Sequence, residues 1–362
     1  MSKPLPQIAI IGAGIFVKTQ YIPRLSEISH LVTVKSIWSR SKESAESAAE
    51  IARKVFPGVE SKWGDEGLDE IVKDEGIIGV AVVLAAQLQV DISTKLLKAG
   101  KHVLQEKPAA ASTEEASTGL SVYKSSLYSP SNPLVWALAE NYRFETAFLE
   151  GRKLVGELGD LMSVQLIVEG SMNNTNPYFS SSWRRNFHGG FILDMGVHMI
   201  AGLRMLVGCE VTSVSAFTHH VDVTLPPPDN VSSILQLENG CSGVFVMSVS
   251  TRSPKIFWRV VGLKGTVQVE RGIEGGRHGY LVLKYDSNGQ STSSFYPFCG
   301  VTEELKAFIY DISKYSLEKV SDHEPDHRLS YAEGARDVAV LEAMLESGQK
   351  QGAIVPVKNI ED

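Results

Sequence analysis

Residues 8–14 read Ile-Ala-Ile-Ile-Gly-Ala-Gly. The apolar run is typical of a buried strand, and the glycines after it let the backbone turn sharply toward a pyrophosphate at a helix N-terminus. Val17 stands where the usual fingerprint has a third glycine. This half-motif alone fits an ordinary strand turn equally well. Because it opens a repeating strand–helix pattern, we interpret it as a dinucleotide-binding turn.

The pattern continues outward from this turn to about residue 137. Short apolar runs predict strands at 8–11, 33–38, 78–84, 102–105 and 134–139, and amphipathic runs between them predict helices at 19–27, 44–55, 67–73, 91–99 and 113–125. Strands that alternate with helices predict a doubly wound, parallel sheet.

The pattern changes after residue 141. A helix at 148–155 and a strand at 161–169 precede a polar loop and an apolar helix at 191–206; strands follow at 211–218, 232–237, 243–250, 257–261, 267–270 and 280–285, then helices at 302–316 and 331–347. Consecutive strands with short turns indicate an antiparallel sheet. We therefore predict an α/β chain of two domains, 1–140 and 141–362, in which the C-terminal helix can pack back on the first.

Composition narrows the possible partners. The chain has 362 residues and a net charge of −7, which argues against nucleic acid and anionic membranes as partners. Its start leaves no room for a signal peptide, and its three cysteines, Cys209, Cys241 and Cys299, are widely spaced. We expect reduced thiols and a cytoplasmic location. The histidines show no ligand spacing with cysteines or acids, so we expect no metal.

The second strand ends in Trp-Ser-Arg-Ser-Lys at residues 38–42. An NAD-specific site normally places an acid here to bind the ribose 2′-hydroxyl, and this segment has none. Ser39, Arg40 and Lys42 would instead bind a 2′-phosphate, for which arginine offers a planar donor group. We predict that NADP(H) is preferred over NAD(H); the alternative is a solvated basic turn.

Two further motifs carry acid–base chemistry. Glu106-Lys107-Pro108 follows a predicted strand, so its lysine leaves the carboxyl end of the sheet, where ligands of doubly wound folds bind. Asp194 and His198 lie four residues apart and share one face of the expected helix. A dinucleotide site with a lysine and an Asp/His pair describes hydride transfer. The alternatives are a surface salt bridge for Lys107 and core packing roles for the pair.

Together these residues resemble the glucose–fructose oxidoreductase, inositol dehydrogenase and rhizopine-catabolism (Gfo/Idh/MocA) family. The matching segments are 12–14, 99–103, 106–108, 140–144 and 189–198, in the same order along nearly the whole chain. The resemblance implies an N-terminal Rossmann domain, a C-terminal α/β domain with an open, mainly antiparallel sheet, and a substrate cleft between them. It also implies a homodimer or homotetramer formed through that sheet.

The resemblance assigns roles to single residues. Lys107 would stabilise the reacting oxygen, His198 would exchange the proton and Asp194 would orient the substrate or the histidine. The expected cofactor contacts are Gly12, Ala13, Gly14, Ile15, Phe16, Ser39, Arg40, Lys42, Leu84, Ala85, Gln89, Glu106, Lys107, Pro108, Trp183 and Arg184. The expected substrate contacts are Asn141, Tyr142, Arg143, Tyr178, Trp183, Asp194 and His198.

One segment departs from the family pattern, and the roles of three other residues stay open. Leu84-Ala85 and Gln89 stand where the family often has Thr-Pro and a histidine, so residue 89 could hydrogen-bond a ribose but not titrate. Arg143 fits a structural ion pair as well as a substrate contact. Trp183 and Arg184 fit either a loop over the cleft or a solvated loop edge.

The leading hypothesis is an NADP(H)-dependent oxidoreductase that acts on the hydroxyl or carbonyl group of a sugar, polyol or other small molecule. Two alternatives stay open. The first is a nicotinamide-dependent glycosidase or a reductase of another unsaturated bond, which net cofactor turnover would distinguish. The second is a regulatory protein that senses NADP without chemistry.

Overall fold

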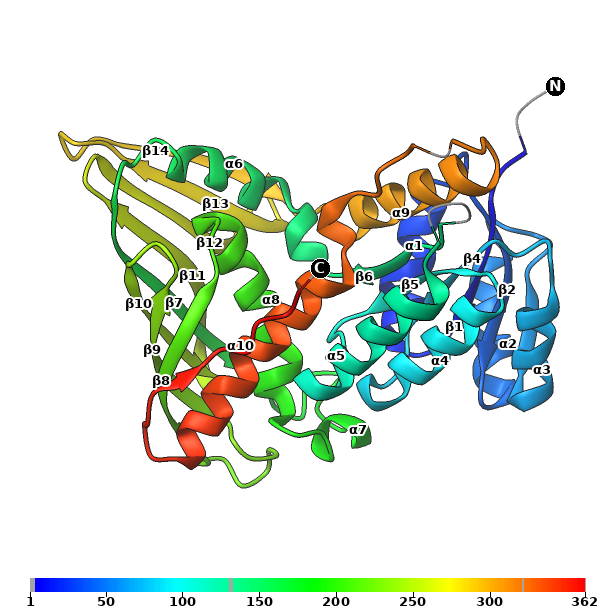
Figure 1. Cartoon of the computed structure of the whole chain (residues 1–362), viewed down its shortest axis with the longest axis horizontal. Coiled ribbons are helices and arrows are strands. Elements are labelled where there is room, and N and C mark those ends of the chain that lie inside the picture. Colours follow the sequence, from blue (N-terminus) through cyan, green and yellow to red (C-terminus); the bar gives the residue numbers. More distant parts are fainter. Residues whose placement is uncertain (1–3, 130–132, 321, 362) are drawn as a thin grey trace. The chain divides into compact units, whose positions relative to one another are not determined.

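The computed structural model describes residues 4–129, 133–320 and 322–361, in two compact units (Figure 1). The first unit comprises Met1–Glu140 and Val301–Gly334, and the second comprises Asn141–Gly300 and Ala335–Asp362. The chain thus passes between units after residue 140, and a later segment, Val301–Gly334, returns to the first. The division into domains 1–140 and 141–362 remains a prediction.

The first unit is built on a six-stranded parallel sheet. Its strands are β1 (Gln7–Ile11), β2 (Thr33–Ser39), β3 (Glu60–Trp63), β4 (Gly79–Val82), β5 (His102–Glu106) and β6 (Trp136–Ala139). Their order in the sheet is β3-β2-β1-β4-β5-β6. The order reverses between β1 and β4, the position at which doubly wound sheets bind ligands beyond the carboxyl ends of their strands. The predicted fold class is confirmed.

The helices that connect these strands are η1 (Val17–Tyr21, a π-helix), α1 (Ile22–Glu27), α2 (Lys42–Ala52), α3 (Gly64–Lys73), α4 (Ala86–Lys98), α5 (Thr113–Val122) and η2 (Tyr123–Leu127). The later segment adds α9 (Gly300–Ser316) and η4 (His327–Leu329). Serines begin two of the connecting helices. Ser41 Oγ accepts a hydrogen bond from the amide of Ser44 at the start of α2, and Ser112 Oγ accepts one from Glu115 at the start of α5.

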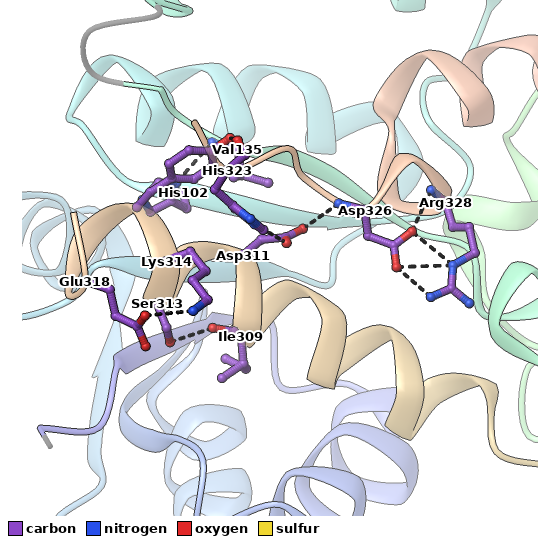
Figure 2. Close-up of polar contacts among 11 residues, drawn as sticks. His102, Val135, Ile309, Asp311, Ser313, Lys314, Glu318, His323, Asp326 and Arg328 are labelled. Atoms are coloured by element: carbon purple, nitrogen blue, oxygen red, sulfur yellow. Dashed lines mark hydrogen bonds and ion pairs between the residues drawn. The ribbon is translucent and has the colours of Figure 1, made fainter. Parts of the chain in front are cut away.

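The returning segment Val301–Gly334 is joined to β5 through His102 (Figure 2). Nδ1 of this buried histidine accepts a hydrogen bond from the amide of Val135 at 3.0 Å, so the hydrogen lies on Nε2, which donates to Ser316 Oγ at 2.9 Å. A histidine bound in this way cannot take a proton from the serine. Burial lowers the pKa of His102 to about 4.

A second polar group fixes the turn after α9. Asp311, which is almost fully buried, lies 2.8 Å from Nε2 of His323 and accepts a hydrogen bond from the amide of Asp326 at 3.0 Å (Figure 2). Asp326 in turn forms an ion pair with Arg328 at 2.5 Å. Burial raises the pKa of Asp311, and the hydrogen bonds oppose that shift. These contacts are structural, because each of these side chains binds another residue of the same turn.

The second unit is built on a nine-stranded sheet. Its strands are β7 (Leu161–Ser171), β8 (Val211–His219), β9 (Asn230–Leu237), β10 (Ser242–Ser248), β11 (Ser250–Gly262), β12 (Gly265–Glu274), β13 (Arg277–Tyr285), β14 (Ser291–Pro297) and β15 (Val355–Pro356). Their order is β14-β13-β12-β11-β7-β10-β9-β8-β15, and all pairs are antiparallel except β7 with β10. The helices of this unit are η3 (Asn141–Phe144), α6 (Thr146–Val155), α7 (Ser182–Arg185), α8 (Gly190–Val207) and most of α10 (Tyr331–Gln349).

Helix α8 is the core of the second unit. Apolar side chains surround it on nearly all sides, and Trp258 Nε1 of β11 donates a hydrogen bond to the carbonyl of Met199 at 2.9 Å. Among the described residues it is the one helix long and apolar enough to span a membrane, with 78% of its apolar window buried inside the structure. That burial is what a core helix requires.

The buried His102 predicts an acid-sensitive first unit. Its pKa is about 4 when folded and 6.5 when unfolded, so the unfolded chain binds more protons between these values and stability falls as the pH drops below 6.5. Urea unfolding should show a loss of about 2 kcal/mol between pH 7.5 and pH 5 from this group. His102→Gln should remove most of that loss, whereas the control His30→Gln, at an exposed position, should retain it. An unchanged pH dependence in His102→Gln would contradict the assignment.

Candidate functional site

The glycine turn lies between β1 and η1. Gly12 has a φ of 127°, and a Cβ at this position would lie 2.2 Å from the carbonyl oxygen of Val83, so only glycine fits. Ala13 is buried, Gly14 and Ile15 are exposed, and Phe16 packs edge-on against Tyr21. The turn therefore leaves backbone accessible at residues 14 and 15, next to the point where the sheet order reverses.

Three cations lie near the carboxyl end of β2. Arg40 is exposed and forms no ion pair or hydrogen bond within the described part of the chain. Lys42 Nζ lies 5.0 Å from the ring of Trp63, and Lys18 Nζ donates to Ser47 Oγ at 3.0 Å. Ser39 is half-buried. Of the three, Arg40 is without a carboxylate partner among the residues that the structure describes.

The segment after β4 supports the lysine loop. Leu84 and Ala85 are half-buried, and Ala85 precedes α4. Gln89 has no exposed surface, and its amide Nε2 donates to the carbonyl of Pro108 at 3.4 Å. Gln89 therefore helps to hold the loop that carries Pro108, and its expected contact with a ribose stays a prediction.

The lysine motif leaves the carboxyl end of β5 with a cis bond between Lys107 and Pro108. Glu106 is buried and accepts a hydrogen bond from the hydroxyl of Tyr21 at 2.8 Å. Burial raises the pKa of Glu106 to about 7, although the charge of Lys107 opposes that shift. Lys107 itself is half-buried. Sequence reasoning missed Tyr21, since one tyrosine in a helix gives no signal of such a contact.

In the second unit, Asp194 and His198 lie on α8, as the spacing predicts. Its tight start needs glycine: Gly189 has a φ of 73°, and a Cβ there would lie 2.6 Å from Leu345. Asp194 forms an ion pair with Nε of Arg184 at 2.6 Å, and both side chains are largely buried. The carboxylate of Asp194 is therefore held by the guanidinium of Arg184.

The polar loop before α8 packs around that arginine. The guanidinium of Arg184 lies 4.9 Å from the ring of Tyr178 and 4.2 Å from that of Trp183. Arg185 donates to the carbonyls of Phe179 and Thr224, which fixes the loop on both sides. The structure thus brings Tyr178, Trp183, Arg184 and Asp194 into one cluster.

His198 is supported by an aromatic ring. The rings of His198 and Tyr142 stack with centroids 4.8 Å apart and 16° between planes. The hydroxyl of Tyr142 accepts a hydrogen bond from Arg271 of β12 at 2.9 Å, and only 3% of Tyr142 is exposed. Tyr142 therefore supports the ring of His198, and its expected contact with the substrate stays a prediction. Arg271 was not anticipated, because a single arginine in a polar strand end gives no signal.

Arg143 belongs to a buried ion network. It pairs with Asp337 of α10, and Nη1 of Arg204 lies 2.8 Å from the other oxygen of the same carboxylate. Arg204 also binds Glu210 at 2.7 Å. The side chains of Arg143 and Asp337 are 3% and 1% exposed. This is the structural ion pair that the sequence left open, and it joins η3, α8 and α10. Asn141, just before it, is half-buried.

Comparison with known proteins decides the family. A model of the oxidoreductase family with an NAD-binding Rossmann fold matches residues 7–126, and the GFO/IDH/MocA C-terminal domain matches residues 152–268. Dehydrogenase FPY6 from Fusarium mangiferae is 32% identical over 97% of this chain and 99% of its own length. The chain belongs to the Gfo/Idh/MocA family.

Other Gfo/Idh/MocA proteins resemble it in sequence or in fold. The scyllo-inositol 2-dehydrogenase (NADP⁺) IolW of Bacillus subtilis is 26% identical over 54% of this chain and 49% of its own length. An oxidoreductase from Thermotoga maritima has a TM-score of 0.80 at 24% identity, over 98% of this chain and 99% of that one. Levoglucosan dehydrogenase in complex with NADH has a TM-score of 0.77 at 20% identity, over 99% and 100%. The two structures share the fold.

Family membership makes this chain an NAD(P)-binding oxidoreductase, with relatives that include sugar and inositol dehydrogenases. The glycine turn, Arg40 and Lys107 lie in its first unit, and Asp194 and His198 lie in its second. No group of histidine, cysteine or acidic side chains suited to a metal occurs among the residues that the structure describes.

The Arg143–Asp337–Arg204 network predicts a large effect of one substitution. Asp337→Asn would leave two arginines without their shared carboxylate, so we expect a loss of about 3 to 5 kcal/mol in the free energy of unfolding. The control Asp69→Asn removes an exposed pair with Lys95, which solvent screens, and should cost far less. Urea unfolding measures both. Equal losses in the free energy of unfolding for the two variants would contradict a stabilising role of the buried network.

Proposed function

We propose that this Gfo/Idh/MocA protein is an NADP(H)-dependent oxidoreductase that acts on the hydroxyl or carbonyl group of a sugar, polyol or similar small molecule. The observation that carries the proposal is the position of Lys107, which follows β5 at the carboxyl end of the parallel sheet. That edge is where doubly wound folds bind their ligands. An ammonium group placed there can hold an oxygen that gains negative charge.

The residues of the first unit fit a dinucleotide. A Cβ at residue 12 would collide with Val83, and the accessible backbone at Gly14 and Ile15 suits a pyrophosphate. The remaining expected contacts, Ala13, Phe16, Leu84, Ala85 and Pro108, line the ends of the same strands. When bound, the nicotinamide would supply or accept the hydride.

We assign the proton and oxygen chemistry to three residues. Lys107 would donate a hydrogen bond to the substrate oxygen and stabilise alkoxide character as it develops. His198 would remove or return the hydroxyl proton, a role that the imidazole of histidine commonly takes in catalysis. Asp194 would orient the substrate together with Arg184, its ion-pair partner. The stack on Tyr142 would limit rotation of the His198 ring.

The preference for NADP(H) rests on Arg40. Its guanidinium is exposed and has no anionic partner in the described structure, while Ser39 and Lys42 are adjacent in sequence. A 2′-phosphate would satisfy this charge, whereas a 2′-hydroxyl would not. Relatives of this chain carry names with either cofactor form, so the direct comparison must be made on this protein.

The substrate assignment rests on the cluster of Tyr178, Trp183, Arg184 and Asp194. Aromatic faces next to a charged, hydrogen-bonding pair suit a ring that carries several hydroxyl groups. The named substrates of relatives, scyllo-inositol and levoglucosan, are of this class. Trp183 would cover the substrate or the nicotinamide from the loop before α8.

We further propose a cytoplasmic homodimer or homotetramer that forms through the open face of the nine-stranded sheet. Helices α6 and α8 pack on the other face, as Figure 1 shows. The open face presents apolar side chains that pair across strands, with Ile234 61% exposed opposite Val244 at 40%, and Phe217 at 56%. A second copy would bury this surface.

Replacement of Lys107 tests the catalytic assignment. Lys107→Met should lower kcat by about 10²- to 10⁴-fold, because the charge on the substrate oxygen loses its stabilising partner. NADPH affinity should change little. The measurement is NADPH oxidation across aldoses, ketoses, inosose and dicarbonyl substrates, with the exposed Lys98→Met as control. Retained turnover in Lys107→Met would remove the assignment.

Replacement of Arg40 tests the cofactor preference. Arg40→Ala should weaken NADPH binding by about 10- to 100-fold, the value of a charge-assisted hydrogen bond, and leave NADH binding unchanged. Fluorescence titration with both cofactors measures this ratio, and the exposed Lys54→Ala serves as control. Equal binding of the two cofactors by the wild type, unaltered by Arg40→Ala, would refute the preference.

A further inference from the structure

Trp63 is an exposed tryptophan at the last position of β3. This strand reads Glu-Ser-Lys-Trp, so its one apolar side chain is also exposed, with 43% of its surface accessible. In a parallel sheet, apolar strand side chains normally pack under the helices that cover both faces. Core packing therefore does not account for Trp63.

The backbone around Trp63 is fixed to β2. Trp63 is the register partner of Ser39, the last residue of β2, in the parallel pair of strands. Trp38 Nε1 donates a hydrogen bond to the carbonyl of Gly64 at 2.8 Å, and Gly64 has a φ of 63°, so the chain turns directly after Trp63. The tryptophan is therefore held beside the strand end that Arg40 follows.

The same edge of the sheet continues to the glycine turn. The amide of Gly12 donates a hydrogen bond to the carbonyl of Trp38 at 2.9 Å. The strand order β3-β2-β1 places the end of β2 between this turn and Trp63, with neighbouring strands about 4.8 Å apart. In doubly wound folds the pyrophosphate lies at the turn after β1 and the adenosine ribose at the end of β2. The next position along this edge is the end of β3.

A cation lies next to the ring of Trp63. Lys42 Nζ is 5.0 Å from the ring centroid, and Lys42 is the first residue of α2. An aromatic face beside an ammonium group suits a ligand that carries an aromatic base and a phosphate close together. The 2′-phosphoadenosine half of NADP(H) has both groups.

We propose that Trp63 binds the adenine base of NADP(H) by stacking, next to a 2′-phosphate that Lys42 binds. The inference rests on the proposed binding of NADP(H). Stacking on an aromatic side chain adds affinity without a choice between ligands, because every base has an aromatic face. Arg40 and Lys42 distinguish a 2′-phosphate from a 2′-hydroxyl by their charge. Trp63 therefore contributes equally to the binding of NADPH and of NADH.

The first experiment measures affinity by isothermal titration calorimetry with NADPH, NADH and adenosine 2′,5′-bisphosphate, the part of NADP that holds the base and the 2′-phosphate. Trp63→Ala should weaken the binding of all three by a similar factor of about 5- to 100-fold, the range for loss of one base–aromatic stack. Trp63→Phe keeps an aromatic face and should keep most of the affinity. Should Trp63→Ala not fold, Trp63→Leu takes its place.

Tyr310→Ala is the matched control. Tyr310 is 56% exposed, and Lys314 Nζ lies 5.2 Å from its ring, so it has the same kind of cation contact as Trp63. It lies on α9 between Phe308 and Ile312, which pack at Gly79, the first residue of β4 and thus the amino edge of the sheet. Its affinities for the three ligands should equal those of the wild type.

The second experiment follows the fluorescence of the tryptophan itself. The chain has five tryptophans, and three of them, Trp38, Trp136 and Trp258, are at most 6% exposed. A base that stacks on Trp63 should change tryptophan fluorescence when adenosine 2′,5′-bisphosphate binds to the wild type. Trp63→Phe should still bind this ligand in the calorimeter and lose most of the fluorescence change. Equal changes in the two proteins would overturn the contact.

The outcomes separate this inference from the proposed cofactor preference. Unaltered affinity for NADPH and adenosine 2′,5′-bisphosphate in Trp63→Ala overturns the adenine contact, while the NADP(H) proposal stands. A loss of affinity for these two ligands but not for NADH also overturns it, because the effect then belongs to the 2′-phosphate. A wild type that binds none of the three ligands overturns both proposals.

Discussion

The close approach of Gly12 to the backbone of Val83 is the constraint on which the first unit depends. Because β1 and β4 are paired, no side chain fits at residue 12 against the carbonyl of Val83. The chain also leaves β1 with a positive φ at Gly12. The same turn starts η1, and η1 places Tyr21 against Glu106. One glycine therefore links the nucleotide-binding turn with the residue that precedes the lysine.

Buried polar groups fix the site in each unit. In the first unit, Tyr21 holds Glu106; in the second, Arg184 holds Asp194. Such contacts cost desolvation, and removal of one partner leaves the other buried and unpaired. Here they lie directly beside the residues to which we assign chemistry, which is why those assignments can be tested one side chain at a time.

The sequence predicted what hydrophobic pattern and turn chemistry determine. The buried strands of the first unit, the apolar helix α8 and the shared face of Asp194 and His198 followed from periodicity. The strands β3, β14 and β15 were missed: all three are edge strands, β3 and β14 are mostly polar, and β15 has only two residues. The burial of Gln89 and Tyr142 could not be predicted, because burial depends on residues that are distant in sequence.

The central claim is that the carboxyl edge of the parallel sheet, from the glycine turn to Lys107, binds the nicotinamide dinucleotide. Hydrogen–deuterium exchange with and without saturating NADPH measures this directly. We expect slower exchange in residues 12–21, 39–42 and 83–89 and at 106–107, the ends of four neighbouring strands. Bound NADPH with unchanged exchange in all of these segments would contradict the account.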